Sequence, residues 1–249
     1  MAASTPTEKE AEQVAQAAAD SLYLPSGVRE HRFFMLKTRV AYRVWRRTLR
    51  RYAGLGRESR FKLLDVGCGP GYLLRCLELW FPHIHSYGFD VEQKYLDFAG
   101  GHLRRTQLVH GRAEQLPFDK EFFRIVCALH VLEHLNRPGE LLAEAYRVLR
   151  PGGLLLAATP NPGGIAARLL KGRWSGWRDD HVSLKPPREW RELVERAGFA
   201  ILDDGTTGLG GFRLFQRLPF SLLNWLPLAV FGYFAWEYGE SYMLVARKS

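Results

Sequence analysis

Apolar positions in the first quarter of the chain follow a helical period. Residues 8–22 are rich in alanine and predict a helix, which residues 24–27 (LPSG) end. Over residues 28–51, apolar side chains recur every three to four positions with arginines on the remaining faces, which predicts a basic amphipathic helix. Residues 1–7 show no period and are expected to be disordered. We therefore expect residues 1–57 to form a helical extension.

From Phe61 onward, short apolar runs alternate with segments of helical spacing. Strands that alternate with helices form a parallel sheet with helices on both faces, so this order predicts one α/β domain over residues 58–249. The predicted strands are 63–66, 84–89, 107–110, 124–128, 154–159, 199–203 and 241–248. The predicted helices are 72–80, 92–100, 138–149 and 189–197.

Three glycines follow the first predicted strand at alternate positions. Residues 63–74 read LLDVGCGPGYLL, which places Gly67, Gly69 and Gly71 between a strand and a helix. Glycine permits positive φ and leaves no Cβ in the way of a ligand. A tight turn needs one or two glycines, so we expect this one to bind a ligand, with its backbone N–H groups pointing outward at something polar.

The positive charge of the chain is concentrated in one segment. The formal net charge is +9, and residues 28–51 carry nine basic residues against a single acid, Glu30. Hydrophobic residues at 47% and charged residues at 24% are otherwise ordinary for a soluble globular protein. An anionic partner is therefore expected at the basic helix and not over the whole surface.

The cysteines predict a reducing compartment. Cys68, Cys76 and Cys127 are odd in number and lack metal-ligand spacing, so we expect free thiols in a cytoplasmic protein. The start of the chain has neither the basic residues nor the apolar core of a secretory signal.

A second acid suggests that the ligand contains a ribose. Asp90 ends the second predicted strand, about twenty residues after the glycines, where a carboxylate can accept from both ribose hydroxyls. The glycine spacing G-C-G-P-G differs from the dinucleotide pattern G-x-G-x-x-G. Asp90 by itself does not distinguish NAD from another adenosine cofactor.

Five stretches of the chain occur in a familiar order. They are LLDVGCGPGYLL, YGFDVEQ, GRAEQLPFDKEFFRIVCALHVLEHL, RVLRPGGLLLAATPNP and HVSLKPPREWRELVERAGF. Together they resemble the class I S-adenosylmethionine-dependent methyltransferases, especially the branch of quinone-biosynthesis and small-molecule O-methyltransferases. The resemblance implies a Rossmann-like seven-stranded, mostly parallel sheet with an antiparallel last strand, S-adenosylmethionine as cofactor and S-adenosylhomocysteine as product.

The resemblance also implies roles for individual residues. The family usually has an acid at Arg112 that accepts from the adenine amino group; arginine only donates, so Ala113 or Glu114 is expected to replace it. A second usual acid is Arg124 here, at a structural position. The implied cofactor contacts are Asp65, Gly67, Cys68, Gly69 and Gly71 for the methionine part, Asp90 with Val91 beside it for the ribose, Ala113 and Glu114 for the adenine, and Leu129 near the sulfonium.

Histidines are the candidates for a catalytic base. His181 is the preferred one and His130 the second, because a neutral imidazole near pH 7 can take a phenolic proton. His134, in VLEHL, is expected to be structural. Asp179, Asp180 and His181 carry metal-ligand atoms, but adjacent residues on one loop rarely converge on one ion, so no metal is expected.

An aromatic insertion over residues 205–238 precedes the last strand and is uncharged from residue 218 to 236. Its length approaches that of a membrane span, but Pro219 and Pro227 would break the helix and the last strand must return to the sheet. Two alternatives remain. The insertion roofs the acceptor site, or it dips into an anionic membrane surface beside the basic helix, which would make the protein peripheral at the membrane.

These features predict methyl transfer to a small, apolar oxygen nucleophile such as a quinone or polyprenyl phenol. An RNA methyltransferase is the alternative, since arginines also bind RNA phosphates, but nucleic acid is less favoured because the aromatics cluster with aliphatic residues and not with lysines. A cofactor-binding regulatory protein without catalysis is the third hypothesis. The motifs carry no information on oligomeric state.

Overall fold

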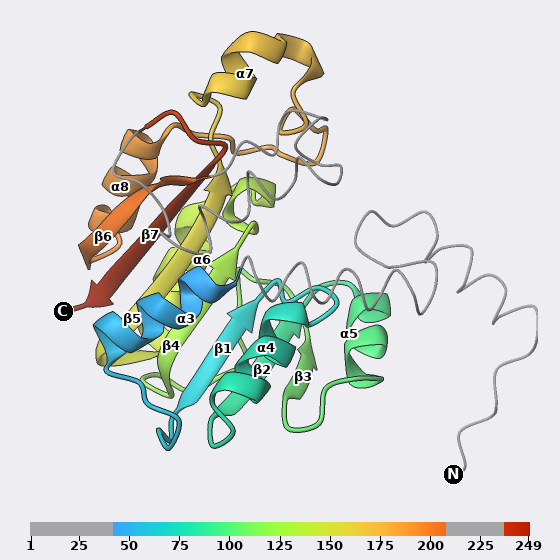
Figure 1. Ribbon diagram of the computed structural model, residues 1–249, viewed down its shortest axis with the longest axis vertical. Helices are drawn as coiled ribbons and strands as arrows, with labels where there is room; N and C mark the ends of the chain where they lie inside the picture. The colour runs from blue at the N-terminus through green and yellow to red at the C-terminus, as the bar shows by residue number, and fades with distance from the viewer. Residues whose placement is uncertain (1–41, 208–236) are drawn as a thin grey trace, which may run out of the picture.

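A seven-stranded sheet organises the protein, whose computed structural model describes residues 42–207 and 237–249. The strands are β1 (Lys62–Val66), β2 (His85–Asp90), β3 (Gln107–His110), β4 (Phe123–Leu129), β5 (Leu149–Pro160), β6 (Phe199–Thr207) and β7 (Ser241–Lys248). They lie in the order β3-β2-β1-β4-β5-β7-β6 (Figure 1). β1 to β5 are parallel, and β7 is antiparallel to both β5 and β6. The predicted fold class is confirmed.

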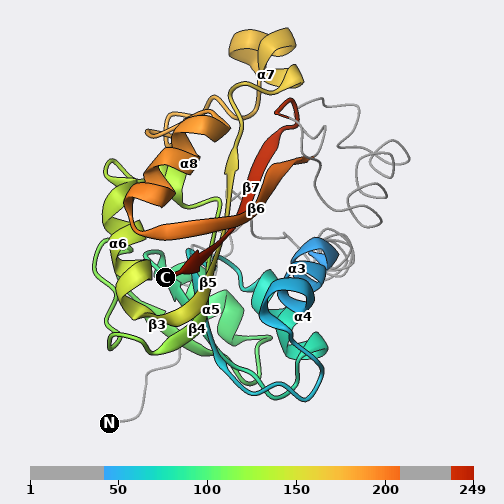
Figure 2. The same cartoon turned by 90° about the vertical axis from the view of Figure 1, so that its left-hand side faces the viewer.

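Helices cover both faces of the sheet (Figure 2). They are α3 (Arg43–Ala53), α4 (Tyr72–Trp80), α5 (Gln93–Gly100), α6 (Pro138–Val148), α7 (Ile165–Leu170) and α8 (Pro187–Arg196), with 3-10 turns η1 (Leu132–His134) and η2 (Lys171–Arg173). Successive strand residues point to opposite faces. Leu63 therefore packs with α3, α4 and α5, whereas Leu64 packs with α6 and α8. Because the central strands β1 and β4 are buried on both faces, they read as nearly continuous apolar runs.

The described part of the predicted extension belongs to the main core. Trp45 and Leu49 of α3 are buried in the same cluster as α4 and the sheet. The helix ends at Gly54, whose φ of 62° is left-handed. Arg124, the second departure from the family pattern, donates from Nη2 to the carbonyl of Ala53 at 2.8 Å and so ties β4 to the end of α3.

Several elements extend beyond the ranges that the apolar pattern predicts. β5 begins at Leu149 because this residue pairs with Phe123 of β4 across a register shift, although residues 149–153 were expected to hold only a helix end and a turn. β6 continues through the polar residues 203–207 because β7 pairs with it along the whole length. The short helix α7 is absent from the prediction.

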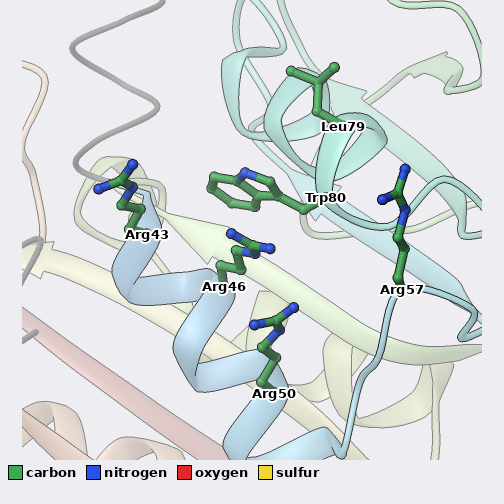
Figure 3. Close-up of a pocket in the computed structure, with 6 residues that line it drawn as sticks. All are labelled: Arg43, Arg46, Arg50, Arg57, Leu79 and Trp80. Carbon is green, nitrogen blue, oxygen red and sulfur yellow. The ribbon is translucent and has the colours of Figure 1, made fainter.

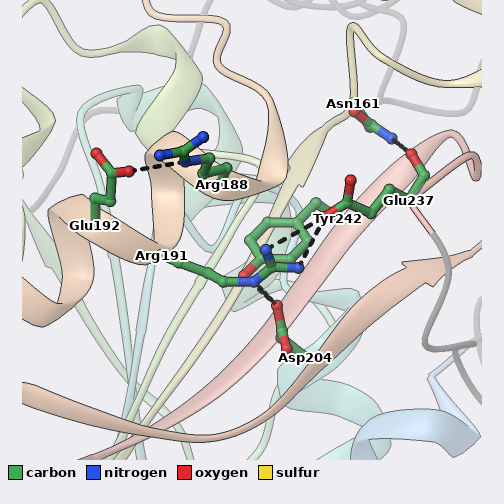
Figure 4. A network of polar contacts seen from close by, with 7 residues as sticks. All are labelled: Asn161, Arg188, Arg191, Glu192, Asp204, Glu237 and Tyr242. Carbon is green, nitrogen blue, oxygen red and sulfur yellow. Dashed lines mark hydrogen bonds and ion pairs between the residues drawn. The ribbon is translucent and has the colours of Figure 1, made fainter.

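A polar network holds α8 against the antiparallel edge of the sheet (Figure 4). Arg191 of α8 pairs with Asp204 of β6 and, at 3.3 Å, with Glu237. Asp204 also accepts the hydroxyl of Tyr242 in β7 at 2.7 Å. Asn161, which follows β5, donates to the carbonyl of Glu237 at 2.8 Å. The approach of the chain to β7 is thereby fixed beside the carboxyl end of β5.

Some predictions fall outside the described residues. These are the disordered start, the helix over residues 8–22, residues 28–41 of the basic helix and residues 208–236 of the aromatic insertion. Whether the insertion covers the acceptor site stays a prediction. Among the residues that the structure does describe, no helix combines the length and the apolar character needed to cross a membrane.

Candidate functional site

The glycine turn joins β1 to α4 at the carboxyl end of β1. The N–H groups of Gly67 and Cys68 donate to the carbonyl of Phe89 at 2.7 and 3.1 Å. The N–H of Gly69 donates to Oδ2 of Asp90 at 2.8 Å. The prediction that these N–H groups point outward at a ligand is therefore wrong, because the turn uses them to bond the end of β2. A ligand at the turn meets bare glycine backbone and the neighbouring acids instead.

The three glycines are required for different reasons. All have positive φ, with values of 65°, 51° and 77° for Gly67, Gly69 and Gly71. A Cβ on Gly67 would lie 2.3 Å from Val131 Cγ2, and one on Gly71 would lie 2.9 Å from Leu103 Cδ1. A Cβ on Gly69 would meet no atom of residues 42–207 or 237–249 within 4 Å. Two glycines thus serve close packing, and Gly69 faces open space that a ligand can fill.

Asp65 places a buried carboxyl group under the turn. Its side chain is 3% exposed, and no hydrogen bond among the described residues engages its carboxylate. Burial, with a contribution from the charge of Asp90, raises its pKa to about 8. A positively charged group beside Asp65 would offset this cost. The site therefore suits a ligand with a cationic end, such as an ammonium group.

Asp90 ends β2 with its carboxylate held in place. Oδ2 accepts from Gly69 and Oδ1 accepts from the N–H of Glu92 at 2.9 Å. Burial raises the pKa of Asp90, and these two bonds oppose the rise. Each carboxylate oxygen can accept a further bond, which is the arrangement that binds two neighbouring hydroxyls of a ribose.

The residues expected near the ribose and the adenine lie on the loops after β2 and β3. Val91, expected beside the ribose, is 54% exposed, and its carbonyl accepts from the ring of His110 at 2.9 Å. Glu114, expected at the adenine, forms an ion pair with Arg112 at 3.3 Å between Oε1 and Nη2. Ala113 lies half-buried between them in the sequence. The contacts of Val91 with the ribose and of Ala113 and Glu114 with the adenine stay predictions.

The end of β4 carries a residue in an unusual conformation. His130 follows Leu129 and has a φ of 59°, which costs a non-glycine residue about 1–2 kcal/mol. Its N–H donates to the carbonyl of Ala158 at 2.8 Å, and its ring is about half exposed. The next residue, Val131, packs on Gly67 of the glycine turn. His130 is therefore adjacent to the turn, on the side where open α/β sheets bind ligands.

Glu133 is a buried acid that the sequence analysis did not single out. It is fully buried, and Oε1 lies 3.2 Å from Nδ1 of His130. Oε2 has no hydrogen-bond partner among the residues that the structure describes. The backbone carbonyl of Glu133 accepts from the N–H of Ser183 at 2.9 Å, which attaches the loop before α8 to η1. The sequence signal was available: His130, Glu133 and His134 share one turn.

His134 and His181 come together on the exposed side of Glu133. Their ring centroids are 4.7 Å apart. Nδ1 of His134 bonds the carbonyl of Asp180 at 3.0 Å, and Nδ1 of His181 bonds the carbonyl of Gly176 at 2.8 Å. A carbonyl only accepts, so each ring carries a proton on Nδ1. Burial lowers the pKa of His181, which favours the neutral ring.

The same cluster has the composition of a cation site. Glu133, His134 and His181 each offer one ligand atom, and these atoms lie within 4.8 Å of one another. Two imidazoles and one carboxylate suit zinc or a related transition metal. Of the adjacent residues 179–181, His181 joins this cluster, whereas Asp180 pairs with Arg178 at 2.8 Å. The absence of a metal stays a prediction.

The cysteines near the site are buried. Within the described part of the chain, Cys68 in the glycine turn, Cys76 in α4 and Cys127 in β4 form no disulfide. Burial, followed by the charge of Asp65, raises the pKa of Cys68 and Cys127 above the ordinary range. A thiol of this kind is a poor nucleophile, so Cys68 contributes shape and not chemistry.

The sheet order and the turn at the end of β1 define a class of fold, the Rossmann-like α/β proteins with a seven-stranded sheet. A methyltransferase of Haloferax volcanii, solved in complex with the Trm112 methyltransferase activator, is similar in fold. Its TM-score is 0.64 at 18% identity, over 98% of this chain and 99% of that chain.

The sequence places the chain within this class. A model of the methyltransferase domain family matches residues 31–203, and the chain belongs to this family of class I S-adenosylmethionine-dependent methyltransferases. One relative is a probable S-adenosylmethionine-dependent methyltransferase of Mycolicibacterium smegmatis, 28% identical over 71% of this chain and 63% of its own. Another is the ubiquinone biosynthesis O-methyltransferase of Maricaulis maris, 31% identical over 63% of this chain and 66% of its own. The chain thus spans slightly less than two thirds of these curated relatives.

The cofactor that family membership identifies is S-adenosylmethionine, with S-adenosylhomocysteine as the product. The residues present fit it. Asp65 has a buried carboxyl that a cationic amino-acid end would neutralise, Asp90 has acceptors for a ribose, and Gly69 leaves open space between them.

Proposed function

We propose that the chain transfers the methyl group of S-adenosylmethionine to the oxygen of a small, apolar acceptor of the phenol or quinol type. The observation that carries this proposal is the group of three histidines around buried Glu133, which adjoins the glycine turn through Val131. The relative from Maricaulis maris, a ubiquinone biosynthesis O-methyltransferase, supports the acceptor class.

The chemistry demands little covalent participation from the protein. The cofactor, when bound, supplies a methyl group on a sulfonium that is already activated. What remains for the chain is to align the acceptor, which lowers a barrier by roughly 7–11 kcal/mol, and to take its proton. Asp65 and Asp90 orient one side of the reaction, and the loop that carries His181 orients the other.

His181 is the residue that we assign to the proton. Its Nδ1 donates to the carbonyl of Gly176, and burial lowers its pKa, which favours the neutral ring, whose Nε2 can accept from a phenolic hydroxyl. His134 packs against its ring and fixes the orientation. His130 stands closer to the turn, and we place it against the acceptor.

The basic helix and the uncharged segment over residues 218–236 indicate where in the cell the protein would act. Together they favour a cytoplasmic protein that meets an anionic membrane surface, where an apolar acceptor would be dissolved. RNA methylation has no observation of its own in the described residues.

Two measurements test the proposal. Calorimetric titration with S-adenosylhomocysteine should show micromolar binding, and isotope-labelled S-adenosylmethionine should methylate at least one member of a panel of catechols and polyprenyl phenols. His181→Ala should keep the affinity for S-adenosylhomocysteine and lower kcat by about 10²–10⁴-fold.

The matched control is His83→Ala, which removes an imidazole that pairs with Glu58 on the surface. It should leave both affinity and kcat unchanged. Absence of S-adenosylhomocysteine binding would contradict methyl transfer altogether. Equal effects of the two histidine variants would instead remove His181 from the mechanism.

A further inference from the structure

Four arginines line a cavity of about 230 Å³ between α3 and the end of α4, which we call the arginine cavity (Figure 3). Its walls come from three separate segments of the chain. They are Arg43, Arg46 and Arg50 of α3, Arg57 of the following loop, and Leu79 and Trp80 of α4.

The arginines share one face of α3 because of their spacing. Arg43, Arg46 and Arg50 are three and four residues apart, so their side chains leave the helix on one side. Arg47 and Arg51 lie outside the cavity lining. The reversal of the chain at Gly54 brings Arg57 to the same side (Figure 3). The cavity is therefore built by the fold as well as by the arginine-rich sequence.

Three of the four cavity arginines form no ion pair with the described part of the protein. None of the ion pairs over residues 42–207 and 237–249 uses Arg43, Arg50 or Arg57. Glu58, the acid next to Arg57, is 82% exposed and pairs with His83 at 3.2 Å. Like charges that converge on one space repel each other, and an anion between them reverses the sign of the interaction.

One wall of the cavity is rigid and apolar. Trp80 is 7% exposed, and the guanidinium of Arg46 lies 5.7 Å from its ring centroid. This contact holds Arg46 in place beside the cavity. Leu79, at the rim, is 47% exposed. An exposed leucine beside guanidinium groups is the arrangement of a surface that meets both the headgroups and the acyl boundary of a bilayer.

We propose that the arginine cavity binds the phosphate group of an anionic phospholipid and so docks this face of the protein on a membrane. Guanidinium groups match phosphate oxygens with paired hydrogen bonds. The volume suits a phosphate ester and is smaller than the roughly 300–1,000 Å³ of pockets for larger ligands. Leu79 at the rim favours a lipid source for the phosphate over a soluble one.

Phosphate binding in the arginine cavity extends the proposed action at a membrane surface. The choice of a lipid as the source of the phosphate rests on that proposed function. Methyl transfer and phosphate binding use different residues, since the cavity lining contains no member of the cofactor or histidine sites. Titration with S-adenosylhomocysteine, run in parallel on every variant, therefore separates failure of one from failure of the other.

The test compares two double variants of the full chain that lose the same charge from the same helix. Arg43→Gln/Arg50→Gln removes two cavity arginines, and Arg47→Gln/Arg51→Gln removes two arginines outside it. Binding is measured by co-sedimentation with phosphatidylcholine vesicles, with and without phosphatidic acid. The cavity variant should bind the acidic vesicles at least about tenfold more weakly, and the control variant should lose less than about threefold.

The remaining arms identify the source of the phosphate. Inorganic phosphate and pyrophosphate should compete weakly, because they lack the contact with Leu79. Tight binding of either without vesicles would assign the cavity to a soluble phosphate and overturn the lipid assignment. Preference for duplex RNA over acidic vesicles would overturn it too. Equal losses in the two double variants would show a charged helix face without a site.

Discussion

Asp65 and Asp90 place two buried carboxyl groups at the carboxyl ends of the adjacent strands β1 and β2. Of the two, and counting donors from the described residues, only Asp90 has backbone donors on both oxygens. Burial, with a contribution from Asp90, raises the pKa of Asp65 to about 8. The two acids thus differ in role. Asp90 is a fixed acceptor for hydroxyl groups, whereas the ionised form of Asp65 is unfavourable until a cation lies beside it.

Asp65 should make the ligand-free protein less stable as the pH rises. Its pKa is about 3.8 in the unfolded chain and about 8 in the folded one. Between these values the folded state holds a proton that the unfolded state has lost, so the free energy of unfolding falls with increasing pH. Asp65→Asn should therefore raise Tm at pH 8 more than at pH 5 and abolish S-adenosylhomocysteine binding.

Thermal melts at several pH values, paired with calorimetry, check this prediction. Asp97→Asn, on the exposed surface of α5, is the control and should change neither quantity. A pH dependence of Tm that is the same in Asp65→Asn and the parent would show that Asp65 is ionised at neutral pH in the folded protein.

Two substitutions in the glycine turn should separate its effect on packing from its effect on cofactor binding. Gly67→Ala brings a Cβ to 2.3 Å from Val131 Cγ2. It should destabilise the protein by several kcal/mol, because the backbone is strained and Val131, which precedes η1, must move. Gly69→Ala meets open space, so its cost should be about 1–2 kcal/mol for the positive φ alone. Its Cβ fills the cofactor space, and S-adenosylhomocysteine affinity should fall sharply.

Denaturant unfolding and calorimetry on both variants measure the two effects. Gly67→Ala should lower the free energy of unfolding more than Gly69→Ala does. Relative to its loss of stability, Gly69→Ala should lower the affinity for S-adenosylhomocysteine more than Gly67→Ala does. If Gly69→Ala binds S-adenosylhomocysteine like the parent, the open space at Gly69 is not part of the cofactor site.

Chelation distinguishes the two uses of the histidine cluster. With His181 as a base, kcat should rise with pH as the imidazole loses its proton, at a pH below the ordinary value for histidine because burial lowers its pKa. EDTA should leave that rate unchanged. Loss of activity on chelation, with recovery on adding zinc or manganese, would assign Glu133, His134 and His181 to a cation instead.

Glu78 should control the loop that supports the glycine turn. Its carboxylate accepts from the N–H groups of Arg104 and Arg105 at 3.0 and 2.7 Å. Burial opposes ionisation, but these bonds outweigh it and lower the pKa of Glu78. Its stabilisation is therefore present above the unfolded value of 4.5 and is lost as the pH falls below it.

Glu78→Gln should cost about 1.5–3 kcal/mol at pH 7, because charge-assisted bonds become neutral ones. The cost should shrink at pH 4. Glu140→Gln, which breaks an exposed pair with Arg137, should cost less than about 1 kcal/mol at either pH. Equal costs, measured by urea unfolding, would contradict the role of Glu78.

The sheet could be predicted because its strands carry their own signal. β1, β4 and β7 are buried on both faces and read as apolar runs. The runs that contain Leu64 and Val126 therefore predict strands from the local sequence alone. The polar end of β6 and the start of β5 follow from pairing with β7 and β4, which are distant in sequence. Local patterns do not contain that information.

The candidate site could likewise be predicted in part from the sequence. Asp65 and Asp90 stand at strand ends beside glycines, where position alone indicates a role. The contact between His134 and His181 is different, because 46 residues separate them and a loop brings them together. The inward use of the N–H groups at Gly67 and Cys68 likewise depends on β2, which follows later in the chain.

The place of β7 between β5 and β6 affects how the protein emerges from the ribosome. β6 ends at Thr207, and β7, its partner along its whole length, begins only at Ser241. At about 5–20 residues per second, the segment between them takes roughly 2–7 s to synthesise. Throughout that interval the nascent chain exposes the edge of β5, and a chaperone that covers this edge would protect it from aggregation.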